Sequence, residues 1–310
     1  MSTLTLKGPY WVAARQHRRV LWAVPILLAV GLVVMVALRV WSAYPTYDAM
    51  HRPLLTPGYD LLRGYMQSAT RVLVFLPLLV GAFVAGPMIA RELESGTWRL
   101  ALTQSTTAKA WLGSKVLVAA AVSVLGSLAL IGIYRLGWTQ VSDTYELYWY
   151  ERGVYAATGP VLVAYCLLGV AIAALVGQLV RRTLPAMAVA GLLTGLVLLV
   201  LSALRWSFLP VVAVTAPYTV DADSLLPPSA KNMGTGLTLT TGERASGYRC
   251  FPEPPTSGGC RDDMDATASY ADFHPTSHYW PTQLIETSIV LVLAAAVLYA
   301  AFRLVQKRHP

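Results

Sequence analysis

Long apolar runs alternate with short polar segments along almost the whole chain. Six of these runs approach the roughly 20 residues that an α-helix needs to cross the hydrocarbon core of a bilayer. They cover residues 20–41, 72–90, 116–134, 159–180, 184–204 and 284–305. No acidic residue stands in the middle of any run. Because backbone polar groups in lipid must pair within the chain, the pattern predicts an all-α membrane protein with six transmembrane helices.

The polar segment between the second and third runs has an ordered chemistry. Arg91, Glu92 and Glu94 stand at the end of the second run. Gly96 follows and can end a helix in the left-handed conformation, and Thr97 can cap the start of a new helix. This order predicts a sharp stop directly before a further helical element.

A short apolar group follows the stop and ends in a second polar run. Trp98, Leu100 and Leu102 are followed by residues 103–107, which include Gln104 and read as a break with a new N-cap. We expect a short amphipathic helix over residues 95–105 that lies flat at the membrane surface, where a soluble partner can push it. An ordinary interfacial hairpin loop is the alternative.

This segment carries a family resemblance. The string ARELESGTWRLALTQS at residues 90–105 resembles the signature of ABC-2-type transporter permeases. A weaker patch, HPTSHYWPTQLIETSIVL at residues 274–291, is similar to the lead-in to the last span of actinobacterial members. The resemblance implies the ABC-2, type V exporter-like permease fold. It also implies a coupling helix that contacts an ATPase subunit through Arg91, Glu92, Glu94, Gly96, Thr97, Trp98, Leu100, Leu102 and Gln104.

Composition and charge support a membrane protein and set its orientation. The chain is 55% hydrophobic and 13% charged, against about a quarter charged residues in an ordinary soluble domain. Its mean hydropathy is +0.53. Lys and Arg concentrate in the N-terminal segment, the second-to-third and fourth-to-fifth connections and the C-terminal tail. The positive-inside rule therefore predicts that both termini lie in the cytoplasm. The resemblance implies that the membrane is a bacterial plasma membrane. The net charge of +8 is explained by this topology, so no nucleic-acid partner is expected.

The domain organisation follows from the spans. Residues 1–19 combine aromatic and basic positions at helical spacing, which predicts an amphipathic elbow helix on the inner leaflet; a frayed basic tail is the alternative. Residues 20–204 hold the first five transmembrane helices. Residues 205–283 are too long for a simple connection and are expected to form an extracellular lid domain. Residues 284–310 hold the sixth helix and a basic cytoplasmic tail.

Cysteines and small residues give further expectations. Cys250 and Cys260 flank a short loop in the expected outer domain, where an oxidising exterior favours a disulfide between them. Gly191 and Gly195 form a GxxxG pattern that lets helices pack closely, within one subunit or across a dimer. His274 and His278 are four residues apart, but nearby prolines argue against a regular helix there, and no metal site is expected.

The remaining patterns bound the function. The chain has no G-x-x-x-x-G-K-[ST] phosphate loop, so it is not expected to be an enzyme that hydrolyses ATP. The resemblance implies two copies of a separate ABC ATPase subunit, which bind the ATP and Mg²⁺, and a second permease subunit that forms a homodimer in membrane lipid. The expected function is export of a hydrophobic or amphipathic substrate such as a drug, an antibiotic peptide or a lipid. A non-transporting sensor or immunity protein, which binds a ligand through its outer domain, is the alternative.

Overall fold

The computed structural model describes residues 18–43, 46–47, 53–54, 56–98, 107–144, 146–218, 220–247 and 266–308. The chain divides into two compact units. The helical unit comprises Met1–Leu147, Glu151–Arg205 and Gln283–Pro310, and the sheet unit comprises Tyr148–Tyr150 and Trp206–Thr282. Residues 1–17 of the expected elbow helix lie outside the described residues, as do residues 99–106, Cys250 and Cys260.

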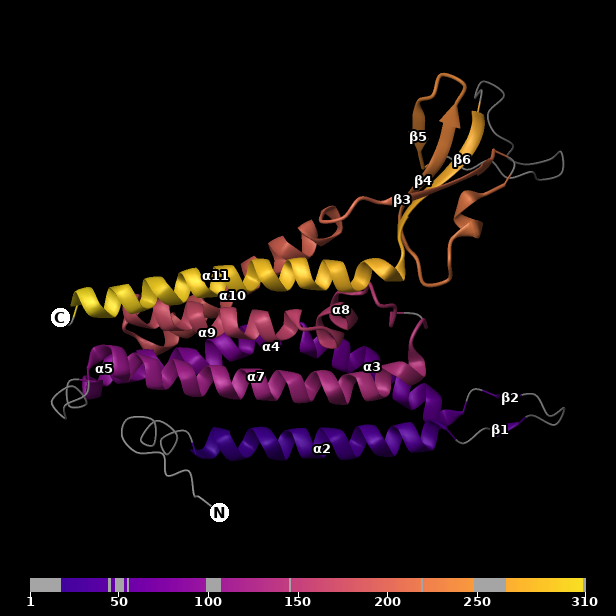
Figure 1. Cartoon of the computed structure of the whole chain (residues 1–310). Helices are drawn as coiled ribbons and strands as arrows, with labels where there is room; N and C mark the ends of the chain where they lie inside the picture. Colours follow the sequence, from indigo (N-terminus) through magenta and orange to yellow (C-terminus); the bar gives the residue numbers. More distant parts are fainter. Residues whose placement is uncertain are drawn as a thin grey trace, which may run out of the picture. The chain divides into compact units, whose positions relative to one another are not determined.

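The helical unit consists of helices that run side by side, together with a short two-stranded ladder (Figure 1). Its elements are α2(Arg18–Ser42), β1(Thr46–Tyr47), β2(Pro53–Leu54), α3(Pro57–Leu73), α4(Leu76–Leu79), the π-helix η1(Val80–Ala85), α5(Gly86–Ser95), α7(Ala108–Val141), α8(Arg152–Thr158), α9(Val161–Val180), α10(Thr183–Leu204) and α11(Tyr279–Arg308). The last of these begins in the sheet unit and continues into the helical unit.

Six helices of the described chain are long and apolar enough to cross a membrane. They are Trp22–Ser42, Leu76–Ser95, Ala108–Val141, Val161–Val180, Thr183–Ser207 and Thr276–Arg308. Each overlaps one of the six apolar runs in the sequence, so the prediction of six spans is confirmed. Two details differ from the expectation: the second span is built from α4, η1 and α5, and the third is 34 residues long.

Helix α9 forms the centre of the helical unit. In its most apolar stretch of 18 residues, 83% of the residues are buried. The helix packs against α4, η1, α5, α7 and α10. Gly169 permits one of these contacts, because a Cβ atom at this position would lie 2.8 Å from the carbonyl oxygen of Pro77. Gly191 and Gly195 of α10 face Ala82 and Leu78 of the same chain, where added Cβ atoms would meet carbon atoms at 3.5 and 3.1 Å.

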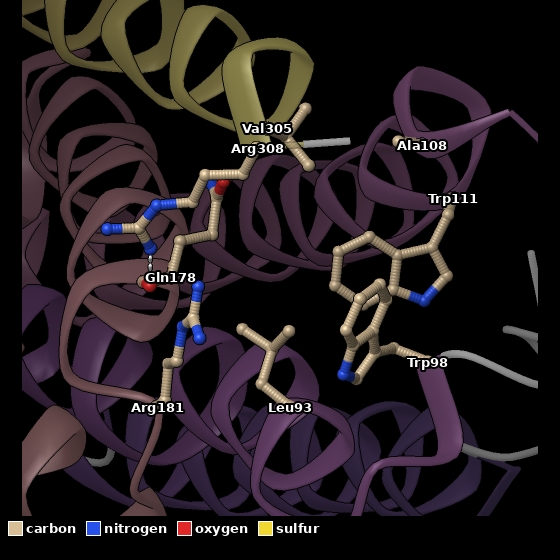
Figure 2. A pocket seen from close by; sticks show the side chains of 8 residues that line it. All are labelled: Leu93, Trp98, Ala108, Trp111, Gln178, Arg181, Val305 and Arg308. Carbon is tan, nitrogen blue, oxygen red and sulfur yellow. Dashed lines mark hydrogen bonds between the residues drawn. The ribbon is translucent and has the colours of Figure 1, made fainter. Parts of the chain in front are cut away.

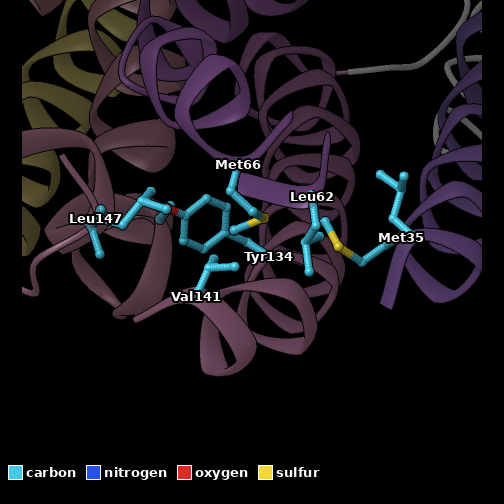
Figure 3. Packing of buried hydrophobic residues seen from close by; sticks show 9 residues of the cluster. Met35, Leu62, Met66, Tyr134, Val141 and Leu147 are labelled. Atoms are coloured by element: carbon cyan, nitrogen blue, oxygen red, sulfur yellow. The ribbon is translucent and has the colours of Figure 1, made fainter. Parts of the chain in front are cut away.

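A second cluster of buried side chains joins α2, α3 and α7. Met35, Leu62, Met66 and Tyr134 pack together there with Val141 and Leu147 (Figure 3). Helix α3 contributes through an i, i+4 row of buried residues, since Gly58, Leu62, Met66 and Thr70 all lie on one face. Figure 1 shows α2 at the edge of the helical unit beside α7, and only 6% of its apolar window is buried.

The sheet unit corrects the expectation of an all-α chain. It contains a four-stranded antiparallel sheet of β3(Val212–Pro217), β4(Lys231–Leu239), β5(Arg244–Ser246) and β6(Ala266–His274) in the order β3-β6-β4-β5. Val212 pairs with Phe273, about sixty positions along the chain. Such long-range pairing leaves little local periodicity, and the Pro- and Gly-rich composition of residues 205–283 hides the strands further.

Candidate functional site

The end of α5 carries the residues that the sequence singled out. Helix α5 ends at Ser95, and Gly96 follows in the left-handed region with φ of 73°. Glycine adopts this conformation without a Cβ penalty, so the predicted stop is observed. Residues 97–98 are helical, and Thr107 caps α7 with its hydroxyl oxygen 3.2 Å from the amide nitrogen of Ala110. The segment is therefore anchored by a defined helix end on each side.

Glu92 joins α5 to α7. Its Oε1 lies 2.6 Å from Nζ of Lys115, and its Oε2 accepts a hydrogen bond from Nε1 of Trp111 at 2.9 Å. The Lys115 side chain is 4% exposed and that of Glu92 is 20% exposed. A lysine this deeply buried needs a counter-ion, because an isolated buried charge loses its hydration without compensation. The pair is therefore a strong link between the two helices.

Glu94 joins α5 to α10. One of its carboxylate oxygens accepts hydrogen bonds from the backbone amide of Thr183, at 2.9 Å, and from the Thr183 hydroxyl. Thr183 is the first residue of α10. A carboxylate at this position satisfies an amide that has no partner within its own helix and interacts favourably with the helix dipole. Glu94 thus caps α10 from a different helix.

A small hollow lies between the ends of α5, α9 and α11 and the start of α7. Leu93, Trp98 and Trp111 form its apolar side, and Arg181 and Arg308 lie on its other side (Figure 2). Ala108, Gln178 and Val305 complete the lining. Its volume is about 20 Å³, which is room for about one water molecule. The hollow can therefore accept the tip of a side chain but not a drug-sized ligand.

Arginine side chains give this end of the helical unit its charge. Arg308 donates a hydrogen bond to the backbone oxygen of Gln178 at 2.6 Å, which ties the end of α11 to α9. Arg181 and Arg182 form the turn between α9 and α10, and both are exposed. Arg91 is exposed on α5. A partner surface that carries acidic groups around an apolar tip would complement this arrangement.

The predicted coupling residues are therefore only partly described. Trp98 lines the hollow, and Glu92 contacts Trp111, which also lines it. Thr97 is exposed, with its hydroxyl 3.0 Å from that of Ser95. Leu100, Leu102 and Gln104 lie outside the described residues, so the short amphipathic helix over residues 95–105 stays a prediction. The same applies to the Cys250–Cys260 disulfide.

Sequence reasoning missed the partners of the two carboxylates. The local pattern did not indicate which residues these carboxylates contact; the described partners are Lys115, Trp111 and Thr183. One signal pointed to Lys115: it stands within an apolar helix, where a charged residue needs a specific partner. No comparable signal marked Thr183.

A buried ion pair at the far end of α10 was also missed. Arg205 and Glu286 form two hydrogen bonds, Nε to Oε2 at 2.6 Å and Nη2 to Oε1 at 2.9 Å, and both side chains are at most 3% exposed. Tyr165 donates a further hydrogen bond to Oε1 of Glu286 at 2.7 Å. The Arg205 guanidinium lies 3.8 Å from the centre of the Tyr155 ring. This network ties α9, α10 and α11 together.

The sheet unit holds a pair of histidines. Nδ1 of His274 lies 3.0 Å from Nδ1 of His278, and Nε2 of His274 lies 3.1 Å from the carbonyl oxygen of Trp206. The carbonyl can only accept, so Nε2 donates and Nδ1 of the neutral ring accepts from His278. Burial lowers the pKa of His274, and the positive charge of Lys231 and the neighbouring His278 act in the same direction, against the hydrogen bond to Trp206.

Within the described ranges, no group of three or more His, Cys, Asp or Glu side chains comes together as a metal site. The two histidines form a hydrogen bond with each other.

Comparison with known proteins identifies the class of the helical unit. Residues 54–205 match the family described as "ABC-2 membrane transporter related". The match covers the span from α3 to the end of α10, including Glu92, Glu94 and their partners Lys115 and Thr183. Residues 54–205 thus carry an ABC-2 membrane transporter related domain, which confirms the resemblance of residues 90–105; residues 274–291 lie outside the matched region. Searches of curated proteins and of solved structures find no match.

Proposed function

We propose that this chain is the permease subunit of an ABC exporter in the bacterial plasma membrane, driven by ATP hydrolysis in a separate ATPase subunit. In this proposal two ATPase subunits serve a permease homodimer, and the cargo is hydrophobic or amphipathic. The observation that carries the proposal is the linkage at the end of α5, within a segment that matches the ABC-2 membrane transporter related family. Such families commonly consist of non-enzymatic membrane components.

The linkage supports a mechanical role. A partner that pushes on the segment between Gly96 and Thr107 acts on the end of α5 and the start of α7 together. Glu92 already joins α5 to α7, and Glu94 joins α5 to α10. One displacement therefore moves three spans at once, and α9 lies against all three. Packed helices of this kind shift between discrete arrangements, which suits the opening and closing of a transport pathway.

The two links differ in strength. The Glu92–Lys115 pair is largely buried, so salt screens it weakly and it holds α5 and α7 in a fixed relation. Glu94 is exposed, so its bonds to Thr183 compete with water and can be made and broken more readily. In the proposed cycle Glu92 keeps α5 and α7 together while Glu94 transmits or releases α10.

The hollow gives the partner a place to contact. Trp98 and Leu93 present apolar surface there, and Arg181 and Arg308 present positive charge. We expect the ATPase subunit to insert one apolar side chain at this point and to carry acidic groups beside it. Arg91 lies exposed on the same helix end and adds to the positive surface.

The experiment that tests this function measures ATP hydrolysis by the reconstituted complex in lipid vesicles. Glu94→Ala and Trp98→Ala should each reduce permease-dependent stimulation of hydrolysis at least tenfold while the chain remains expressed and inserted. The matched controls are Glu146→Ala, an acidic residue outside this site, and Trp22→Ala, an exposed tryptophan on α2. Full stimulation in both test variants would refute the coupling role.

A further inference from the structure

A lipid-facing cleft opens between α2, α3 and α7, away from the coupling segment. Its volume is about 350 Å³, at the lower end of the range of ligand pockets. Helix α2 lines it with Leu28 and Gly31, and α7 lines it with Ile133 and Tyr134. Helix α3 supplies the third wall, where Tyr65 and Ser68 are among the lining residues.

Two close contacts between α2 and α7 bound the cleft. At one end the sulfur of Met35 lies directly over Gly137, where it leaves no room for a Cβ atom. At the other end Val24 approaches Gly126, where a Cβ atom would lie 3.7 Å from the side chain of Val24. Gly126 and Gly137 are eleven residues apart on one helix, which corresponds to about 16 Å at 1.5 Å per residue. The cleft is therefore a slot of limited length, and the Met35 end also carries the tightly packed cluster of Figure 3.

The slot is open where Gly31 lies. A Cβ atom at Gly31 would have no heavy atom within 4 Å. Between the two contacts, then, α2 and α7 do not fill the space between them. A close-packed membrane protein rarely leaves such a volume empty, because the atoms that line it lose their dispersion contacts.

The chemistry of the lining is that of a hydrocarbon site. None of the described residues that line the cleft is charged. The hydroxyl of Ser68 donates to the backbone oxygen of Gly64 at 2.9 Å, and the hydroxyl of Tyr134 is bonded to that of Thr70 at 2.6 Å. The hydroxyl groups of Ser68 and Tyr134 already have hydrogen-bond partners within the protein, so they need none from a ligand. An apolar chain can enter without leaving a buried group unpaired.

The bilayer is the source of such a chain. Helix α2 is almost entirely exposed along its apolar window, and Leu27, which lines the cleft, is 70% exposed. The mouth of the cleft therefore lies on the face of the helical unit that meets lipid tails. A water-soluble ligand would have to cross that apolar surface, whereas an acyl chain is already present there.

We propose that this cleft is a binding site for one acyl chain of a membrane lipid. The acyl chain lies along α2 and α7 between the Met35–Gly137 and Val24–Gly126 contacts, and α3 forms the third wall of the site. Its hydrocarbon replaces the side-chain contacts that Gly31 leaves open. The site does not depend on the proposed transport function, because it requires only the helical unit in a bilayer.

Photocrosslinking with the purified full-length chain tests the site. The chain is reconstituted in phosphatidylcholine vesicles that contain a trace of phosphatidylcholine with a diazirine in the middle of one acyl chain. After illumination, mass spectrometry locates the labelled residues. Gly31→Phe and Ser68→Leu each place an apolar side chain in the slot, from α2 and α3. Gly132→Phe is the matched control, since Gly132 is exposed on α7, lies outside the lining and likewise has open space around it.

The site predicts labelling concentrated on the residues of α2, α3 and α7 that line the cleft, at least fivefold above that on the exposed faces of α10 and α11. Gly31→Phe and Ser68→Leu should each lower the labelling of the cleft at least fivefold, and Gly132→Phe should leave it unchanged. Labelling spread evenly over all exposed spans, with no effect of either filling variant, would overturn the proposal and leave ordinary annular lipid as the explanation.

Discussion

Two carboxylates, two residues apart on α5, contact different neighbours. Successive helical residues are rotated by about 100°, so Glu92 and Glu94 point to opposite sides of the helix. Glu92 meets the ammonium of Lys115 and the indole of Trp111, and Glu94 meets the start of α10 at Thr183. At the residue scale, therefore, Glu92 and Glu94 connect α5 to two other spans, α7 and α10.

The mostly buried ion pair between Glu92 and Lys115 should contribute measurably to the free energy of unfolding. Glu92→Gln removes the counter-ion of Lys115 but keeps the size of the side chain. We expect a loss of about 2–3 kcal/mol in the free energy of unfolding, because breaking a mostly buried pair leaves an uncompensated charge. Lys115→Gln in the same background should recover part of this loss. Chemical unfolding of the chain in detergent, for the two single variants and the double variant, measures the coupling energy.

The exposed pair between Arg71 and Glu146 is the control for this cycle. Their side chains are 69% and 40% exposed, and their closest N–O distance is 2.9 Å. Glu146→Gln should therefore change stability by less than about 1 kcal/mol. If Glu92→Gln and Glu146→Gln lowered the free energy of unfolding equally, burial of the Glu92–Lys115 pair would not explain its contribution to stability.

At the scale of elements, the length of the apolar helices was predictable from the sequence, but the way the elements pack and pair was not. The six runs in the sequence correspond to six helices because roughly 20 apolar residues suffice to define a span. Helix α3 was missed because Asp60, Arg63 and Arg71 interrupt its apolar positions, and only its i, i+4 row packs inward. The π-helix between α4 and α5 has no sequence signature that differs from an ordinary apolar helix.

The junction from β6 to α11 is an element whose stability should depend on pH. His274 ends β6 and is 2% exposed. Its neutral ring accepts a hydrogen bond from His278 at Nδ1 and donates one from Nε2 to the carbonyl oxygen of Trp206. Burial lowers its pKa in the fold below the value of about 6.5 in an unfolded chain. The folded state then binds fewer protons than the unfolded state. The stability of this junction is therefore fully present above about pH 6.5 and declines as the pH falls below that value towards the lower pKa of the fold.

Thermal unfolding of the full chain, followed by tryptophan fluorescence between pH 5 and 8, measures this dependence. Trp206 lies beside His274, with ring centres 5.6 Å apart, and Trp149 lies 5.8 Å from Trp206, so these two tryptophans contribute a signal from the sheet unit. The melting temperature should fall on the acid side of pH 6.5 in the native chain, and His274→Gln should flatten that part of the curve. An unchanged acid slope in His274→Gln would assign the effect to other groups.

At the scale of the whole molecule, the sequence predicted the helix ends on either side of the segment between α5 and α7, but not the contacts between the spans. The helix stop at Gly96 and the new cap at Thr107 follow from local chemistry, and both are observed. The contacts of Glu92 with Lys115 and of Glu94 with Thr183 join residues 23 and 89 positions apart. Such contacts depend on how the spans pack, which local patterns do not encode. The buried Arg205–Glu286 pair escaped notice for the same reason, since its partners stand on different spans.

The strands of the sheet unit show the same limit. Their partners lie far apart in the sequence, and the segment between the fifth and sixth spans offered only a composition rich in Pro, Gly, Ser and Thr. The expectation of a separate region between those spans rested on its length. The sheet unit comprises Trp206–Thr282 together with Tyr148–Tyr150, and that second segment had no signal in the sequence.

In the proposed function the chain works with a separate ATPase that contacts the segment between α5 and α7. The most direct measurement is to purify the C-terminally tagged chain from its native membrane in mild detergent and to identify co-purifying proteins by quantitative mass spectrometry. The permease assignment predicts a P-loop ATPase in equimolar amount with the chain, and its loss when Trp98 is replaced by Ala and Leu93 by Glu. A preparation that lacks any ATPase, under conditions in which a known ABC complex stays intact, would contradict the permease assignment.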